Sequence, residues 1–297
     1  MYIVYGDESH DPNQQRVYAV TGVIGSQADW DAVESRWLKV TGGKTIHAAD
    51  LESDRGDFKN IPHEDNLQLY RSLVTILADS PLMGYSAVID LVAYKIFFPD
   101  VVENVPYVHC FRRVLEHFGK LAHVLIPQDK IQFKFHTNIK TQFTASELFY
   151  EYRKLASQDY DQYFDEIEFI SMESTGIQIA DLYVRETMKH GFKHFNGDHS
   201  FRGSFKRLID TKRFKADYFE KEYWEDYRNK LPEIEKTAGI TRDDYMKWLK
   251  EKGLADNSVN RTSFVAYINE MDRRKSKAKL NDDSNLPVHS DAPEEGA

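Results

Sequence analysis

The order of strand-like and helix-like segments is the feature of this sequence that most restricts its fold. Two apolar segments rich in β-branched and aromatic residues, Tyr2–Ser9 and Val17–Ile24, are separated by a short polar loop. This spacing predicts an antiparallel hairpin. Further strand-like segments follow at residues 84–91, 131–136 and 166–171. Helical patterns alternate with these strands, which favours an α/β protein with a mixed sheet flanked by helices.

Amphipathic helices are predicted where apolar residues recur at intervals of three and four. They cover residues 27–40, 62–77, 107–125, 144–156 and 177–190. Three further helices, at 216–231, 241–252 and 262–272, predict a helical C-terminal appendage. We therefore predict a sheet domain at 1–192, a basic segment with the helical appendage at 193–275, and a tail at 276–297. The tail has almost no large apolar residues and is expected to be disordered.

Composition excludes several classes of protein. The only cysteine, Cys110, rules out an intrachain disulfide and a cysteine-rich zinc site. No apolar run reaches the length of a membrane span, and the N-terminus has no signal-peptide pattern, so we expect a cytoplasmic protein. The net charge of -9 is not typical of a nucleic-acid-binding protein as a whole.

Adjacent carboxylates end the first predicted strand, in the segment Gly6-Asp7-Glu8-Ser9. The period of two in a strand sends Asp7 and Glu8 to opposite faces of the sheet. A strand end holds an acidic side chain rigidly, as a catalytic or metal-binding group requires. The alternative is ordinary turn chemistry, in which Asp and Ser are common.

The helix predicted at 177–190 carries a polar stripe. Gln178, Asp181 and Arg185 are spaced by three and four residues and share one face, while the other faces are apolar. Such a stripe directs polar groups at a partner or ligand. The alternative is an exposed ion pair between Asp181 and Arg185, which would contribute little to stability.

Three motifs in this order resemble those of a bacterial and phage protein family, classed as a domain of unknown function, whose members have a ribonuclease H-like fold. Members open with a YxDESG strand, often carry an intervening His and Asp, and close with an LQxADL helix. The corresponding segments here are Tyr5–Ser9, His47–Leu51 and Ile177–Leu182. The resemblance covers residues 1–192. It implies a ribonuclease H-like mixed sheet flanked by helices.

The resemblance also implies an acidic site for Mg²⁺ or Mn²⁺, with Asp7 and Asp181 as metal ligands. Hard oxygen ligands suit these ions, and a few carboxylates suffice because Mg²⁺ keeps several waters. Further carboxylates expected to contribute to catalysis are Glu8, Asp50 and Glu173. His47 is expected to orient a ligand or contact a phosphate, or else to be an ordinary packed or surface histidine.

One position departs from this pattern. The fourth strand of such folds often ends in a carboxylate, whereas the segment here ends in His136. Neither histidine nor the nearby Asn138 supplies the negative charge that a paired metal site prefers. Glu116 or Glu173 is a possible substitute. Otherwise the protein binds one metal ion or is catalytically inactive.

Residues 185–215 are locally basic. The segment carries Arg185, Lys189, Lys193, Arg202, Lys206, Arg207, Lys212, Arg213 and Lys215 against Glu186, Asp198 and Asp210. Basic side chains contact phosphates, and interleaved phenylalanines stack on unpaired bases. The residues expected to bind substrate are His47, Gln178, Arg185, Lys189, Lys193, Lys206 and Arg207. The alternative is a solvated segment whose phenylalanines are buried.

The leading hypothesis from the sequence is a Mg²⁺- or Mn²⁺-dependent nuclease that hydrolyses phosphodiester bonds in RNA or DNA. By the resemblance, its biology would be bacterial defence or a mobile element. One alternative is a catalytically inactive ribonuclease H-like module that binds nucleic acid or protein, and another is a metal-dependent phosphohydrolase of small nucleotides. A protein partner or a homo-oligomer remains open.

Overall fold

The structure is a computed structural model that describes residues 1–97, 105–126, 129–139, 141–155, 163–237 and 242–252. The chain divides into two compact units, residues 1–226 and residues 227–297. The helix predicted at 262–272 and the tail predicted at 276–297 lie outside the described residues. Within the described part of the chain, no helix combines the length and apolar character needed to cross a bilayer.

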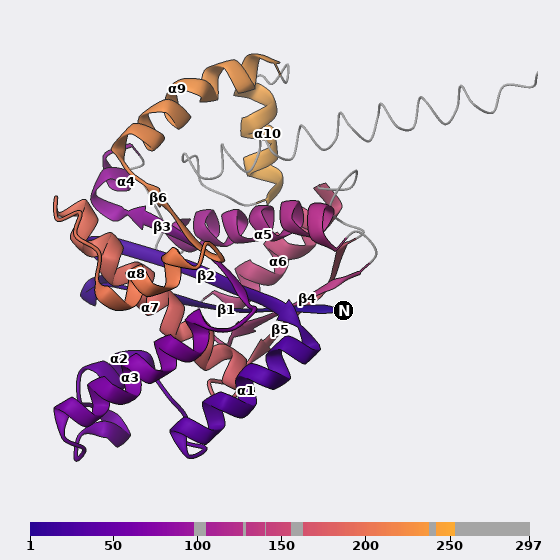
Figure 1. Cartoon of the computed structure of the whole chain (residues 1–297). Helices are drawn as coiled ribbons and strands as arrows, with labels where there is room; N and C mark the ends of the chain where they lie inside the picture. Colours follow the sequence, from indigo (N-terminus) through magenta and orange to yellow (C-terminus); the bar gives the residue numbers. More distant parts are fainter. Residues whose placement is uncertain (98–104, 127–128, 140, 156–162, 238–241, 253–297) are drawn as a thin grey trace, which may run out of the picture. The chain divides into compact units, whose positions relative to one another are not determined.

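The first unit is built on one six-stranded mixed sheet (Figure 1). Its strands are β1 (Tyr2–His10), β2 (Val17–Ser26), β3 (Met83–Asp90), β4 (Ile131–His136), β5 (Phe164–Ile170) and β6 (Phe214–Phe219). They lie in the order β5-β4-β1-β2-β3-β6. The first three strands form an antiparallel meander, whereas β4, β5 and β6 each pair in parallel with a neighbour.

Helices cover both faces of this sheet (Figure 1). Those of the first unit are α1 (Gln27–Thr41), α2 (Ala48–Glu52), α3 (His63–Ala78), α4 (Leu91–Phe97), α5 (Val105–Leu125), α6 (Gln142–Leu155), α7 (Thr175–Phe195) and α8 (Gly203–Asp210). Short 3-10 turns lie at Pro12–Gln14 and Gly56–Phe58. Helix α9 (Lys221–Thr237) crosses from the first unit into the second, and α10 (Arg242–Lys252) belongs to the second.

The main core lies between β1, β2 and the helices α1, α3 and α7. Its largest buried members include Trp30 and Trp37 of α1, which pack with apolar residues of α3 and α7. Trp30 also donates a hydrogen bond from Nε1 to the carbonyl of Ile3, 3.0 Å away. Helix α1 has clear ends because Ser26 and Asp29 form a reciprocal capping box and Gly42 takes a left-handed φ of 63°. This core fixes α7 against β1.

The α/β architecture with a mixed sheet is confirmed, and the end of the sheet domain was predicted wrongly. Helix α7 runs past residue 192, and α8 and β6 belong to the same unit as the sheet. Residues 214–219, at the start of a predicted helix, form the edge strand β6 beside β3. This short strand buries only Phe214 and Phe219 at its ends, a pattern that sequence periodicity does not separate from a helix start.

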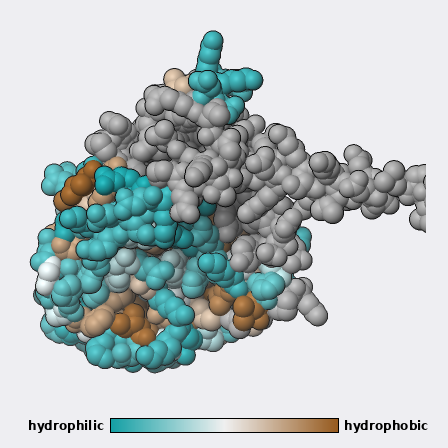
Figure 2. Space-filling view, turned by 90° about the horizontal axis from the view of Figure 1, so that it is seen from above, coloured by the Kyte–Doolittle hydropathy of each residue, from teal (hydrophilic) through white to brown (hydrophobic). Residues whose placement is uncertain are grey.

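The surface of the described residues is mostly hydrophilic when seen from above, with hydrophobic side chains in separate patches (Figure 2). Single exposed apolar residues are normal on a folded protein. Among the large apolar residues that the structure describes, Ile139, Val124 and Phe143 have the largest exposed fractions.

Substitution of Gly176 tests the packing of α7 on β1. A Cβ atom on Gly176 would lie 2.4 Å from Cγ of Tyr5, closer than packed carbon atoms approach. We expect Gly176→Ala to lower the free energy of unfolding by about 1–3 kcal/mol, despite alanine's better helix propensity. Gly203→Ala is the control because nothing lies within 4 Å of the added atom. Equal urea-denaturation midpoints for the two variants would contradict this packing.

Candidate active site

Two buried aspartates from distant parts of the chain lie on the same face of the sheet. Asp7 follows Ile3 and Tyr5 on the face of β1 that packs against α1 and α7. Asp181 lies on the side of α7 that covers this face, and the side chains of Asp7 and Asp181 are only 4% and 7% exposed. Burial and then the negative charge of Asp7 raise the pKa of Asp181. The two carboxylates therefore interact directly through space.

Asp7 lies in β1 one residue beyond the end of its pairing with β4, whereas the sequence predicted that the strand itself ends here. It is held by its own strand and by this neighbouring strand. Its Oδ1 accepts a hydrogen bond from the Glu8 amide at 2.9 Å. His136 ends the parallel strand β4, and its Nδ1 lies 3.3 Å from the same oxygen. The hydrogen bond to Asp7 raises the pKa of His136 despite partial burial. Asp7 thus has a partner that carries positive charge when protonated.

Asp181 is held by the segment that leads into the short helix α2. The Ala48 amide donates a hydrogen bond to Asp181 Oδ2 at 2.7 Å, and His47 Nδ1 lies 3.8 Å from that oxygen. The His47 side chain is 49% exposed, so it borders the carboxylate from the solvent side. The sequence resemblance placed a His and an Asp in this segment, and the structure brings its histidine beside Asp181.

The polar stripe of α7 is matched along its length by residues 46–52. Gln178 Oε1 accepts hydrogen bonds from the Ile46 amide at 3.1 Å and from Trp37 Nε1 at 3.0 Å. Its Nε2 donates to the carbonyls of Met172 and Glu173. Gln178 is therefore buried and committed to protein groups, which corrects the expectation that it binds substrate. Its contacts position the His47 segment against α7.

Farther along α7, basic residues converge on Glu52 at the end of α2. Arg185 Nε lies 3.2 Å from Glu52 Oε2, Arg202 lies 2.8 Å from Oε1, and Lys189 also donates to Oε1. Burial disfavours the charge of Glu52, but the hydrogen bonds from Lys189 and Arg202 prevail and lower its pKa to about 2. Arg185 and Lys189, expected to bind substrate, are therefore engaged in a structural ion-pair network.

A second carboxylate, that of Glu186, belongs to the same network as Glu52 and was not among the predicted site residues. Glu186 is fully buried and accepts hydrogen bonds from Tyr70, Ser204 and Arg202. The only sequence signal was that Glu186 is one of three acidic residues within the basic segment. Its partners come from α3 and from the start of α8, so only the tertiary structure identifies it.

The other expected carboxylates do not join the Asp7–Asp181 pair. Glu8 lies toward α5, where burial and the charge of Glu8 raise the pKa of Tyr107. Glu8 accepts hydrogen bonds from Asn138 and Thr141, and burial with the charge of Asp7 raises its pKa to about 7. Asp50 faces Arg55 at 3.5 Å. Glu173 and Glu116 also lie outside the pair. Glu173 is exposed, and Glu116 forms ion pairs with Arg112 and Arg113.

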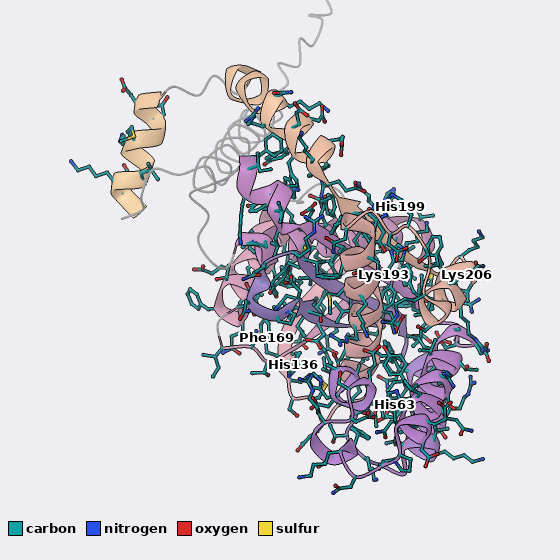
Figure 3. The ribbon with its side chains drawn as sticks, turned by 90° about the vertical axis from the view of Figure 1, so that its left-hand side faces the viewer. His63, His136, Phe169, Lys193, His199 and Lys206 are labelled. Carbon is teal, nitrogen blue, oxygen red and sulfur yellow. The ribbon has the colours of Figure 1, made fainter. Side chains whose placement is uncertain are left out.

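We call Lys193 at the end of α7, which is partly buried, and Lys206 and Arg207 on α8, which are exposed, the exposed basic surface. Each has an acidic neighbour at the surface, with Lys206 2.5 Å from Asp210 and Arg207 3.6 Å from Asp79. Such exposed pairs contribute little net energy to the fold. In Figure 3, Lys193 and Lys206 lie apart from His136, so this surface is separate from the carboxylate pair.

The carboxylate pair suits a divalent cation with few protein ligands. The hydrogen bonds and ion pairs within the described residues use Oδ1 of Asp7 and Oδ2 of Asp181, which leaves one oxygen of each carboxylate for a ligand. No group of three or more His, Cys, Asp or Glu side chains in these residues is arranged to hold a metal ion. Two carboxylates are the number of protein ligands that Mg²⁺ commonly takes when it keeps several waters.

Comparison with known proteins adds no assignment. No protein-family model matches the chain, and no curated protein matches it significantly.

The network around Glu52 makes a testable contribution to stability. Because the pKa of Glu52 falls from 4.5 to about 2 on folding, its charge stabilises the fold fully above pH 4.5 and progressively less as the pH falls toward 2. We expect Glu52→Gln to lower the free energy of unfolding at pH 7 by about 1–3 kcal/mol. This difference from wild type should narrow below pH 4.5 in urea titrations.

The control is Glu64→Gln, which removes an exposed partner of Arg71. Its effect should stay within about 0.5 kcal/mol at every pH. A deficit of Glu52→Gln that stays constant from pH 7 to pH 3 would contradict the ion-pair explanation.

Proposed function

We propose that this protein is a divalent-metal-dependent nuclease of ribonuclease H-like fold that hydrolyses phosphodiester bonds of RNA or DNA. The observation that carries the proposal is the buried pair Asp7 and Asp181, one from the central strand β1 and one from the helix that covers it. Two interacting carboxylates removed from water are costly unless a cation or a proton offsets their charge.

The topology of the sheet supports the fold assignment. Five strands in the order β3-β2-β1-β4-β5, the first three antiparallel and the last two parallel, agree with a ribonuclease H-like sheet. The sixth strand, β6, extends it beside β3. The site lies at the carboxyl ends of the neighbouring parallel strands β1 and β4, the edge at which ligands bind in open α/β sheets.

In this proposal Asp7 and Asp181 hold Mg²⁺ or Mn²⁺ together with water molecules. Such an ion polarises the scissile phosphate and lowers the pKa of bound water. The exposed side chain of His47 borders the site and contacts a phosphate oxygen of the substrate. The Ala48 amide fixes the orientation of Asp181, and His136 fixes that of Asp7.

The alternative is a catalytically inactive module that keeps the fold and binds nucleic acid, and His136 favours it. A protonated His136 beside Asp7 offsets part of the negative charge without a metal ion. The two functions differ in one respect that is easy to measure. The nuclease requires both aspartates for cleavage, whereas the binding module keeps its affinity when they are replaced and cleaves nothing.

The decisive experiment replaces each aspartate with its amide. We expect wild-type protein to cleave single-stranded or duplex nucleic acid with Mg²⁺ or Mn²⁺, and EDTA to abolish cleavage. Asp7→Asn and Asp181→Asn should each reduce the rate by about 100-fold or more, because an amide keeps the shape and loses the charge that holds the ion. Asp50→Asn is the matched control and should remain active, since Asp50 faces Arg55.

A binding measurement accompanies the activity assay. Mn²⁺ should raise the melting temperature of the wild type and of Asp50→Asn, with little effect on Asp7→Asn. If wild type shows no Mn²⁺ effect and no cleavage while retaining nucleic-acid affinity, the inactive module replaces the nuclease. Cleavage that persists in Asp7→Asn would refute the proposed site.

The exposed basic surface should contribute to substrate affinity and not to the rate of the cleavage step. We expect combined replacement of Lys193, Lys206 and Arg207 by glutamine to weaken nucleic-acid binding and to reduce the slope of log affinity against log salt, because fewer counterions are released. The control replaces three exposed lysines elsewhere, Lys39, Lys120 and Lys221. Equal salt slopes for the two triple variants, measured by fluorescence anisotropy, would exclude this surface.

A further inference from the structure

Two histidines face each other at the C-terminal end of α7. His194 lies in the last turn of the helix and His199 in the loop that follows, and their Nδ1 atoms are 2.9 Å apart. Their ring centroids are 4.7 Å apart, with the planes inclined at 69°. The loop reverses at Gly197, which has a φ of 82° and donates its amide to the His194 carbonyl. This turn places His199 over His194.

A third residue, Glu220, decides which ring nitrogen of His194 carries the proton. His194 Nε2 lies 2.5 Å from Oε1 of Glu220, which follows β6 directly. An ionised carboxylate only accepts hydrogen bonds, so Nε2 carries the proton and a neutral His194 presents a lone pair at Nδ1. Metal-binding histidines commonly donate their other ring N–H to a carboxylate, which makes them stronger ligands. Glu220 stands in this relation to His194.

From this arrangement we propose that His194 and His199 form a binding site for a transition-metal ion of the Zn²⁺, Ni²⁺ or Cu²⁺ class. At metal–nitrogen distances of about 2.0–2.1 Å, two ligands at 90–110° are roughly 2.8–3.4 Å apart. The Nδ1 atoms already have such a separation. Binding replaces the proton shared by the two nitrogens. Imidazole selects these ions, in contrast to the oxygen ligands proposed for Mg²⁺ at Asp7 and Asp181.

The neighbouring charges permit a cation at this position. Lys193 is the nearest basic side chain of α7, and it is paired with Asp198 at 3.0 Å and hydrogen-bonded to Ser200. His190 is buried; its Nδ1 lies 2.7 Å from the Tyr218 hydroxyl, and its Nε2 is buried without a hydrogen-bond partner among the described residues, so we do not count it as a ligand of an open site. With two histidines as protein ligands, the remaining coordination positions belong to water or to a small exogenous ligand. The site is therefore open and exchangeable.

The test is a calorimetric titration of the full, untagged chain with Ni²⁺ and Zn²⁺ in a buffer that does not chelate metals. We expect one tight equivalent for wild type and at least a 10-fold loss of affinity for His199→Ala, an exposed position at which folding should be unaffected. Glu220→Gln should weaken binding by about 10- to 100-fold while both ligands remain. Thermal melts confirm that each variant is folded.

The matched control is His63→Ala. His63 is likewise exposed, and its Nδ1 lies 2.7 Å from Oδ2 of Asp54. Its hydrogen-bond partner among the described residues is thus a carboxylate and not a second histidine. This variant, and Asp7→Asn, should bind Ni²⁺ as wild type does, which separates the site from the proposed nuclease centre. If wild type binds no Ni²⁺ or Zn²⁺, or if His199→Ala and His63→Ala bind equally well, the proposal is overturned.

Discussion

The pairing of the polar stripe of α7 with residues 46–52 is the interaction on which the rest of the structure depends. Buried polar groups are costly unless they are hydrogen-bonded, and in this stripe Gln178 and Asp181 are buried and Arg185 is partly buried. The Ile46 and Ala48 amides satisfy Gln178 and Asp181, while Glu52 satisfies the basic end of the stripe. Because β1 packs beneath the same helix, these hydrogen bonds also fix Asp181 relative to Asp7 and bring His47 to the edge of the site.

The charges along α7 change sign from one end to the other. Asp181, the partner of Asp7, lies in the N-terminal half of α7. The Glu52 network lies at its centre, and Lys193 and His194 occupy its last turn. The basic groups in the last turn complement the helix dipole, whereas the first turn carries no acidic residue. The helix therefore separates two kinds of donor, carboxylate oxygens suited to Mg²⁺ and imidazole nitrogens suited to transition metals. The two proposed metal sites follow from this separation.

His136 is the residue at which the two functional proposals diverge. In the nuclease it orients Asp7, and in the inactive module it replaces the metal as the source of positive charge. The same contact serves both, because an imidazole 3.3 Å from a carboxylate is a hydrogen-bond partner in either protonation state. What separates the two is whether a divalent ion competes successfully for Asp7, which depends on the charge of Asp181 as well.

The sequence by itself determined the α/β class and the positions of the first five strands, and it singled out Asp7 and Asp181 as candidate site residues, because periodicity and short motifs are local properties of the chain. Only the tertiary structure decided that β6 is a strand, since an edge strand of six residues depends on pairing with β3. It likewise decided that Gln178, Arg185 and Lys189 are bound to the protein's own groups. Their partners, Ile46 and Glu52, are more than 130 residues away in sequence, and no local pattern reveals such a contact.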